Sequence, residues 1–454
     1  MLGRPPNVPR RAGQRSHIEL EDIQGNVLRG YTMPAAAYLW LRIVDVERAC
    51  ALMRRMLPQV ATAAPWSSPP ASAMNVSFTY AGLAVLGLPD SVLGSFPEAF
   101  RDGMAARAEQ LGDRGPSAPS EWEFSGAHVL VSVCAVDVEH LRAALTEVLA
   151  ADVENGVELV FLQRAEALPG GKDHFGFFDG IAQPAVAGAG VSPRPGDGQP
   201  DGAGGWRDVA TGELLLGYAD EDGTLPVAPV EPFERNGTFV VYRKLAMDVA
   251  AFRRYVASAG YPGGPERLAA KIVGRWPDGT PLTLSPDGPD AAIAGDSQRI
   301  NAFSYADDAD GFKCPLGAHI RRANPRDSPG FFDGRLSNRH RIVRRGRAYG
   351  APLAPGVVED DGVDRGLIFV CFQADIWRQF ETIQALWIDD GDPFGLGRDK
   401  DFLVGEPHGT AGKMTIQGHP PFFLKPQPRF VTLRGGDYLF QPSMTALRVL
   451  AQSE

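Results

Sequence analysis

The chain has 454 residues, of which 44% are hydrophobic and 22% are charged, and its net charge is −10. This composition is typical of a globular protein that is long enough for two domains. The net negative charge does not support a general affinity for nucleic acid or for membrane surfaces. No segment has the ~18 to 20 apolar residues that a membrane span requires. We therefore expect neither nucleic acid nor a membrane as a partner.

The four cysteines lack the spacing of metal ligands, and Cys134 and Cys371 lie inside apolar runs. Buried thiols of this kind act as small core residues, so we do not expect a disulfide framework. Residues 1–17 are basic and rich in proline, and they lack the apolar stretch of a signal peptide. We expect this segment to be disordered and the protein to be cytoplasmic.

An apolar run, an aspartate and a helical pattern follow one another four times along the chain. Val, Ile, Phe and Tyr favour a strand. The aspartate can then accept hydrogen bonds from free amides in the first turn of the helix. The apolar runs are residues 38–44, 128–136, 239–245 and 367–372, and their aspartates are Asp45, Asp137, Asp248 and Asp375.

These four units form two pairs, and each pair resembles a split β-α-β unit. The sequence therefore predicts an α+β protein with two ferredoxin-like domains, each an antiparallel sheet with helices on one face. Residues 187–206 are rich in Gly, Pro and Asp and are typical of a loop. We place the domains at residues 18–235 and 236–454, after the disordered segment 1–17, with a cofactor bound near their interface.

The pentapeptide Gly-Phe-Phe-Asp-Gly occurs at residues 176–180 and again at residues 330–334. Only the first copy continues into Ile-Ala-Gln-Pro, whereas the second lies in a stretch punctuated by Pro, Asp and Asn. Glycines permit sharp turns and close approach to a flat ligand, and apolar walls can shift the pKa of a carboxyl group. We interpret Asp179 as functional and Asp333 as a turn residue.

The segment 314–326 contains His319, and an Arg-Arg-Gly sequence begins at Arg344. A histidine ring nitrogen can ligate haem iron, and nearby arginines can pair with haem propionates. Asp179 could move the proton that peroxide cleavage requires, and Arg344 could stabilise the charge that develops. An aspartate with an ordinary pKa near 3.9 would favour activity in mildly acidic solution. The candidate propionate partners are Arg321, Arg322 and Arg326.

The sequence leaves two assignments open: the arginine that faces the iron, and the residue that relays electrons. The run around Ile342-Val343 has strand character, so Arg344 and Arg345 should point to opposite sides, and only one of them should reach the iron. Substrates that are too large to enter the site need a residue that relays electrons from them to the haem, and Tyr349 is the preferred candidate. Trp377 and Trp387 are alternatives that are more often core residues.

With these motifs in order, the chain resembles a dye-decolourising peroxidase of the longer branch almost end to end. The resemblance begins at residues 22–30, passes through the three motifs above and residues 379–387, and ends at residues 430–440. It implies two ferredoxin-like domains, haem b, and oxidation of dyes, phenolics and other reductants by hydrogen peroxide. It also implies that Asp179 is the distal acid–base residue, Arg344 the distal arginine and His319 the axial ligand.

The resemblance further suggests residues around the cofactor. Gly180, Ile181 and Gln183 follow the distal aspartate and are expected to lie against the haem. The axial histidine of a peroxidase usually donates its second N–H to an acid, and Glu381 is the candidate, although it could equally lie on a solvated helix face. A homo-oligomer is possible from the sequence. The alternatives are a haem carrier or sensor, in which Asp179 is only structural, and a haem oxidase dedicated to a biosynthetic step.

Overall fold

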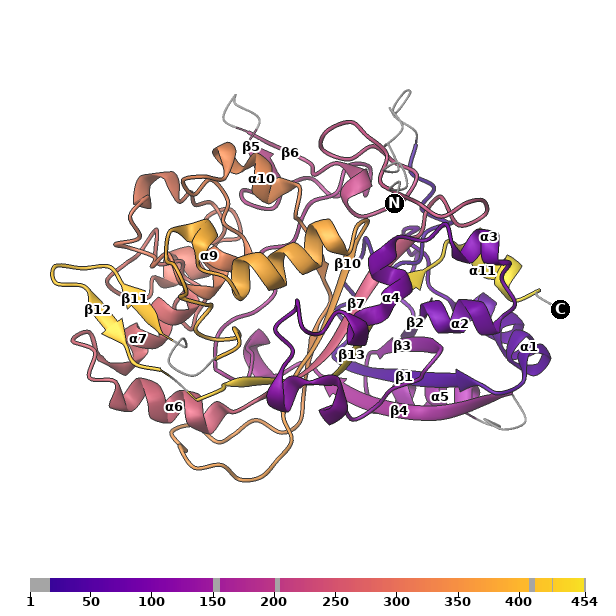
Figure 1. Cartoon of the computed structure of the whole chain (residues 1–454), viewed down its shortest axis with the longest axis horizontal. Coiled ribbons are helices and arrows are strands. Elements are labelled where there is room, and N and C mark those ends of the chain that lie inside the picture. Colours follow the sequence, from indigo (N-terminus) through magenta and orange to yellow (C-terminus); the bar gives the residue numbers. More distant parts are fainter. Residues whose placement is uncertain (1–16, 150–155, 201–204, 408–412, 427, 453–454) are drawn as a thin grey trace, which may run out of the picture.

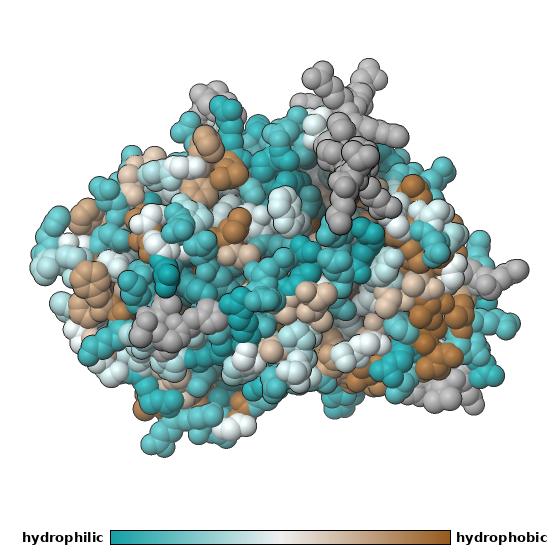
Figure 2. All heavy atoms as spheres, viewed as in Figure 1, coloured by the Kyte–Doolittle hydropathy of each residue, from teal (hydrophilic) through white to brown (hydrophobic). Residues whose placement is uncertain are grey.

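The computed structural model describes residues 17–149, 156–200, 205–407, 413–426 and 428–452 (Figure 1). The disorder expected for residues 1–17 therefore concerns a segment that lies, apart from His17, outside the described residues. The surface seen in Figure 2 is mostly hydrophilic, with hydrophobic side chains gathered in small patches. Among the described residues, no helix is both long enough and apolar enough to cross a membrane.

The centre of the molecule is one antiparallel sheet of nine strands in the order β4-β1-β3-β2-β13-β7-β10-β8, with β9 also paired to β10. Its first half contains β1 (Ala35–Ile43), β2 (Ser72–Phe78), β3 (Val129–Ala135) and β4 (Val157–Glu166). Its second half contains β7 (Thr238–Met247), β8 (Val343–Arg344), β9 (Arg347–Tyr349), β10 (Gly366–Gln373) and β13 (Val431–Gln441).

Each half has the strand order of a ferredoxin-like fold, which confirms the predicted fold class. When the strands of each half are numbered by their order along the chain, those of the first half lie side by side in the order 4-1-3-2. The second half has the same order, with β8 and β9 together in the place of strand 2. The two halves meet where Phe440 of β13 pairs with Phe78 of β2. The domain boundary near residue 235 stays a prediction.

The four predicted aspartates each accept a hydrogen bond from the amide three residues later, at 2.7 to 3.0 Å. This contact satisfies a free amide at the start of each helix and places the helix directly after its strand. The helices that begin in this way are α1 (Val46–Met56), α5 (Val138–Leu149), α6 (Val249–Ser258) and the π-helix η8 (Trp377–Ile388).

Shorter elements complete the two halves (Figure 1). The first half adds α2 (Tyr80–Val85), α3 (Asp90–Leu93), α4 (Glu98–Ala106) and, from the end of the chain, α11 (Met444–Leu450). The remainder adds β5 (Gln199–Pro200), β6 (Trp206–Arg207), α7 (Gly264–Val273), α8 (Ala291–Ala294), α9 (His319–Ala323), α10 (Arg335–Asn338), β11 (Met414–Ile416) and β12 (Phe422–Leu424).

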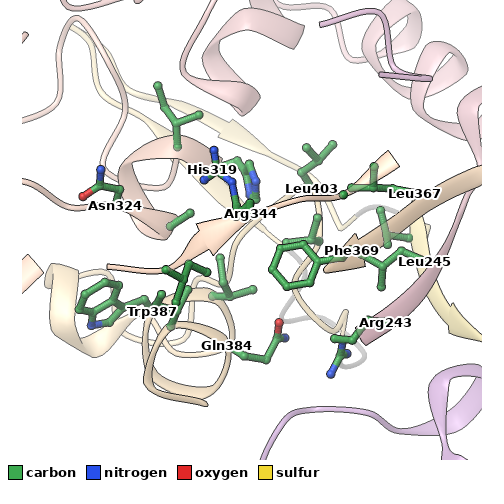
Figure 3. Close-up of a pocket in the computed structure, with 18 of the residues that line it drawn as sticks. Arg243, Leu245, His319, Asn324, Arg344, Leu367, Phe369, Gln384, Trp387 and Leu403 are labelled. Atoms are coloured by element: carbon green, nitrogen blue, oxygen red, sulfur yellow. The ribbon is translucent and has the colours of Figure 1, made fainter. Parts of the chain in front are cut away.

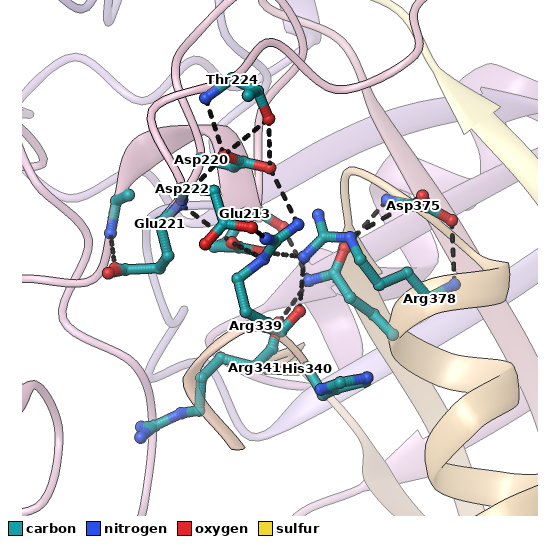
Figure 4. A network of polar contacts seen from close by, with 12 residues as sticks. Glu213, Asp220, Glu221, Asp222, Thr224, Arg339, His340, Arg341, Asp375 and Arg378 are labelled. Carbon is teal, nitrogen blue, oxygen red and sulfur yellow. Dashed lines mark hydrogen bonds and ion pairs between the residues drawn. The ribbon is translucent and has the colours of Figure 1, made fainter. Parts of the chain in front are cut away.

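A buried ion network ties the segment between the two halves to helix η8 (Figure 4). Glu213 has no accessible side-chain surface and accepts a hydrogen bond from Arg378, while Arg339 also contacts Glu213 and Asp220. Burial raises the pKa of Glu213 to about 7, and the charge of Arg378 opposes that rise. The network fixes the start of a helix whose other face lines the cavity described next.

Candidate active site

Asp179, His319 and Arg344 line one cavity of about 340 Å³ in the second half of the molecule. Figure 3 shows His319 and Arg344 close together, with Leu245, Leu367 and Phe369 from the sheet and Trp387 from η8 around the same space. The three residues are separated by 140 and 25 positions in the sequence, so the fold brings them together. A concave site that combines apolar walls with polar and charged groups at fixed positions is typical of a cofactor pocket.

His319 opens α9 and is held by an aspartate that the sequence analysis did not identify. Its Nδ1 lies 2.9 Å from Oδ2 of Asp401, whose Oδ1 accepts hydrogen bonds from the amides of Leu403 and Val404. Burial lowers the pKa of His319, but the charge and hydrogen bond of Asp401 outweigh it, so the pKa is raised. The Nε2 atom is therefore left free for a metal ion.

The prediction that Glu381 pairs with His319 is wrong. Glu381 points away from the cavity and accepts two hydrogen bonds of 2.6 Å from Arg107, together with bonds from Gln110 and from the hydroxyl of Tyr438. Because Phe380, Ile383 and Gln384 of the same helix line the cavity, the opposite face of η8 carries Glu381 towards the first half. Glu381 therefore joins the two halves.

We expect Arg107→Met to destabilise the fold by about 3 to 5 kcal/mol, because it leaves Glu381 buried without its ionic partner. The Glu381 side chain is only 3% accessible, and that of Arg107 is 13% accessible. Chemical denaturation of the variant and the wild type measures this difference. Arg42→Met removes a surface pair with Glu158, whose side chains are 42% and 55% accessible, and should change the stability by less than about 1 kcal/mol. Equal effects of the two variants would contradict the prediction.

Arg344 faces the cavity and Arg345 does not. The Nη2 of Arg344 donates to the carbonyl oxygen of Ala182 at 2.9 Å. The guanidinium of Arg345 donates instead to Asn26 and Val27 of the first half, and burial lowers its pKa to about 10. The alternation of a strand, here β8, separates the two side chains as expected.

Gln183 is not among the residues that line the cavity. Its side chain accepts a hydrogen bond from the amide of Arg344 and donates one to the carbonyl oxygen of the same residue, at 3.1 and 3.0 Å. It therefore fixes the backbone of Arg344, which corrects the expectation that Gln183 contacts the cofactor. Gly180 and Ile181, in contrast, do line the cavity.

A tight turn presents Asp179. Its amide donates to the carbonyl oxygen of Gly171, and one of its carboxylate oxygens accepts from the amide of Gly180 at 2.6 Å. Gly180 has a φ of +76°, a left-handed conformation that strongly favours glycine. In the second copy of the pentapeptide, Asp333 lies in a turn with a φ of +54°, outside this cavity, as expected.

Besides Arg344, three of the arginines that line the cavity form no ion pair among the residues that the structure describes. Arg326 donates to oxygen atoms of Asn301 and Phe303, and Arg275 to those of Gly279, Ile300 and Asn301. Arg341 donates to the backbone oxygen of Asp197. Burial lowers the pKa of Arg275 to about 9 and that of Arg341 to about 10. Buried charges are normally paired, so this end of the cavity is suited to anionic groups.

Arg321 and Arg322 do not contribute to this charge, contrary to expectation. The guanidinium of Arg321 is fully buried and donates to Asp308 and to the carbonyl oxygen of Cys314. That of Arg322 donates to the carbonyl oxygens of Trp387, Asp390 and Asp399. Both side chains pack the segment that carries His319, and neither lines the cavity. Arg275 and Arg341, which the sequence analysis missed, take this place.

The cavity fits a haem. It offers a histidine whose free ring nitrogen is held in orientation by Asp401, and a set of buried cations without anionic partners that could receive two propionates. Its walls are largely apolar, as a porphyrin face requires. The apolar lining includes Val273, Phe303, Ile320, Leu367, Phe369, Phe380, Ile383, Trp387, Leu403 and Val431.

Tyr349, the predicted electron relay, lies outside the cavity and is only 2% exposed. Its hydroxyl donates to Asp364 at 3.2 Å, and the ammonium of Lys244 lies 4.8 Å from the centre of its ring. Burial and the charge of Asp364 both raise the pKa of Tyr349. Trp377 is 66% exposed, whereas Trp387 is buried against the cavity.

Comparisons with known proteins agree with this architecture. Residues 22–165 match the model of the DyP dimeric alpha+beta barrel domain, and residues 226–394 match that of the Dyp-type peroxidase C-terminal domain. The dye-decolorizing peroxidase of Mycena epipterygia is 30% identical, over 96% of this chain and 87% of the relative. The multifunctional dye peroxidase DyP2 of an Amycolatopsis species is also 30% identical, over 95% and 96%.

Solved structures show the same likeness. An ancestral D-type dye decolorizing peroxidase aligns with a TM-score of 0.83 and 29% identity, over 95% of this chain and 99% of the other. A dye-decolorizing peroxidase in complex with 2,6-dimethoxyphenol aligns with a TM-score of 0.82 and 27% identity, over 96% and 100%. The fold and the site thus define a peroxidase with two ferredoxin-like halves. The chain belongs to the dye-decolourising peroxidase family.

Proposed function

We propose that the protein binds haem b, reduces hydrogen peroxide, and oxidises dyes and phenolic compounds. The observation that carries this proposal is that Asp179, Arg344 and His319 line one cavity, with His319 held from behind by Asp401. The complex of a similar structure with 2,6-dimethoxyphenol supports the phenolic substrate class. A cytoplasmic location and a homo-oligomeric state stay predictions.

The haem would supply the iron at which peroxide is reduced. In our proposal, Nε2 of His319 would hold the iron, and Asp401 would keep a proton on Nδ1, which makes the imidazole a stronger donor. Arg326, Arg275 and Arg341 would hold the propionates. These cations are fixed by backbone and amide oxygens, so they are in place before a ligand arrives.

Asp179 and Arg344 would act on the peroxide. A carboxylate oxygen of Asp179 takes the proton from one peroxide oxygen and returns it to the other, which leaves as water. The guanidinium of Arg344 stabilises the negative charge that develops as the O–O bond breaks. Its contacts with Ala182 and the bracing of its backbone by Gln183 keep it oriented without substrate.

An absorption spectrum before and after one equivalent of hydrogen peroxide tests the proposal. A Soret band that shifts on addition of peroxide, and returns when a phenol is added, is the expected result. A Soret band that does not respond to peroxide would instead indicate a haem carrier. A protein without a Soret band after incubation with haemin would contradict the cofactor assignment.

Arg344→Leu should slow the reaction with peroxide by about 10² to 10³, because the developing charge loses its fixed cation. Arg345→Leu is the matched control, since it removes a neighbouring guanidinium that points to the first half. Stopped-flow absorbance in the Soret region measures both rates. If Arg345→Leu reacted more slowly than Arg344→Leu, then Arg345, and not Arg344, would be the cation that stabilises the developing charge.

Tyr349 is our candidate for relaying electrons to bulky substrates. Its hydroxyl already donates a hydrogen bond to Asp364, a carboxylate that can accept the phenolic proton when the ring loses an electron. Tyr349→Phe should therefore lower kcat for bulky dyes more than for small phenols. Tyr255→Phe, which removes a hydroxyl bonded to Lys425, is the control. Equal losses on both substrate classes would remove Tyr349 as a relay.

A further inference from the structure

The cavity contains a second carboxyl group on the turn that carries Asp179. Residues 171–179 form a tight hairpin in which Lys172 pairs with Phe178 in antiparallel fashion. The amide of Asp173 donates to the carbonyl oxygen of Phe177 at 2.8 Å, and Oδ1 of Asp173 accepts from the amide of Phe177 at 2.9 Å. Asp173 therefore stands directly opposite Phe177 on the hairpin.

Hairpin geometry places the two carboxyl groups on the same face. Side chains directly opposite each other in an antiparallel pair share a face, and so do side chains two positions apart on one strand. Asp173 shares a face with Phe177, and Phe177 shares it with Asp179. In agreement, all three residues line the cavity.

The electrostatic surroundings couple the two groups. Burial raises the pKa of Asp173 to about 6, the amide of Phe177 opposes this, and the negative charge of Asp179 raises it further. The proton affinity of Asp173 therefore depends on the charge of its neighbour on the hairpin. The other charged or titratable side chains that line the cavity are Asp113, Arg243, Arg275, His319, Arg326, His340, Arg341, Arg344, Asp389, Glu406 and Arg429.

We propose that Asp173 is a second proton-carrying group of this site, and that it acts through Asp179, its neighbour on the same face of the hairpin. The inference rests on the proposed function. In mildly acidic solution Asp173 holds a proton in the buried part of the site, beside the carboxylate that acts on the peroxide. Asp173 is a positioning residue in this scheme, because it acts through Asp179 and not on the peroxide.

The complete reaction needs a source of protons, and Asp173 can supply it. Hydrogen peroxide takes up two electrons from reductants and two protons, and gives two molecules of water. Asp179 only moves a proton from one peroxide oxygen to the other, so it supplies no net proton. When protonated, Asp173 can pass to Asp179 one of the protons that the second water needs, and Asp173 then regains a proton from the solvent or from an oxidised phenol.

Infrared pH-difference spectra of the haem-loaded protein test the pair, because protonated carboxyl groups have their own stretching band. We expect Asp173→Asn to remove one carboxyl titration near pH 6. Asparagine keeps an oxygen that can accept from the amide of Phe177, so the hairpin is preserved. Asp179→Asn should move the Asp173 titration to lower pH, because a neighbouring negative charge is lost.

Asp437→Asn is the matched control. Burial also raises the pKa of Asp437 to about 6, but this carboxylate accepts from the amides of Met104 and Tyr438 and does not line the cavity. Its loss should leave the Asp173 titration, and the shift of that titration in Asp179→Asn, unchanged. An Asp173 titration that keeps its pH in Asp179→Asn would overturn the proposed coupling.

Stopped-flow measurements separate this inference from the proposed function. Asp173→Asn should retain most of the wild-type rate with peroxide at pH 5, because asparagine resembles the protonated carboxyl group. A loss at pH 5 as large as that of Asp179→Asn would assign Asp173 to peroxide cleavage itself and overturn its role as a proton store. If Asp179→Asn shifts the infrared titration but reacts normally with peroxide, the pair stands and the base assignment fails.

Discussion

Asp179→Asn is expected to slow the reaction with hydrogen peroxide by about 10² to 10⁴. Asparagine has nearly the same shape as aspartate and can still accept the amide hydrogen bond of Gly180, but it cannot take a proton from peroxide. Haem content should therefore stay near that of the wild type while the rate falls. Stopped-flow absorbance at several peroxide concentrations gives the second-order rate constant.

The chain supplies its own control for this variant. Asp333 lies in a second copy of the same pentapeptide, in a turn outside the cavity. Asp333→Asn makes the same chemical change in the same local sequence and should leave the rate with peroxide unchanged. If Asp179→Asn and Asp333→Asn react equally fast, Asp179 is not the base, and the proton must be moved by another group.

His319→Ala should purify with little haem, because it removes the nitrogen that holds the iron. The ratio of Soret to protein absorbance, measured after reconstitution with haemin, reports this loss. His140→Ala is the matched control, since His140 also contacts an aspartate, Asp137, at 2.9 Å but lies on the surface of α5. Full haem occupancy in His319→Ala, with the spectrum of the wild type, would remove the ligand assignment.

Asp401→Asn tests the partner of the histidine separately. Mutation of a hydrogen-bond partner of a metal-binding histidine typically lowers metal affinity or activity by 10-fold to 100-fold. This effect is smaller than that of losing the ligand itself. The variant should therefore retain haem but release it faster to an acceptor protein. Glu381→Gln changes the carboxyl group that the sequence first suggested, and it should not alter the coordination of the iron, because Glu381 contacts Arg107 on the other face of η8.

Local features of the sequence predicted much of the fold. Each capping aspartate lies three residues before the amide that it accepts from, so an apolar run, an aspartate and a helical pattern together locate a strand and its helix. The duplication of these units then indicated two ferredoxin-like halves. The alternation of β8 likewise predicted that only one of two adjacent arginines, Arg344 or Arg345, faces the cavity.

Contacts between distant segments could not be read in the same way. Asp401 lies 82 residues beyond His319, and it reaches the histidine only because the segment after η8 folds back over α9. Glu381 was a reasonable alternative by residue type, but a helix has two faces and the sequence did not show which one meets the cavity. Arg321 and Arg326 both follow His319 closely in the sequence, but only Arg326 lines the cavity. The sequence did not show which of the two side chains points into the cavity.

The position of α11 has a consequence for how the protein is made on the ribosome. Met444, Ala446, Leu447 and Leu450 are buried in the core of the first half, where the carbonyl oxygen of Leu450 accepts from the thiol of Cys50. Figure 1 shows this last helix among the first helices of the chain. The first half is synthesised before the second but lacks part of its own core until residues 444–450 have been made. Its core is therefore complete only after the second half has also been synthesised.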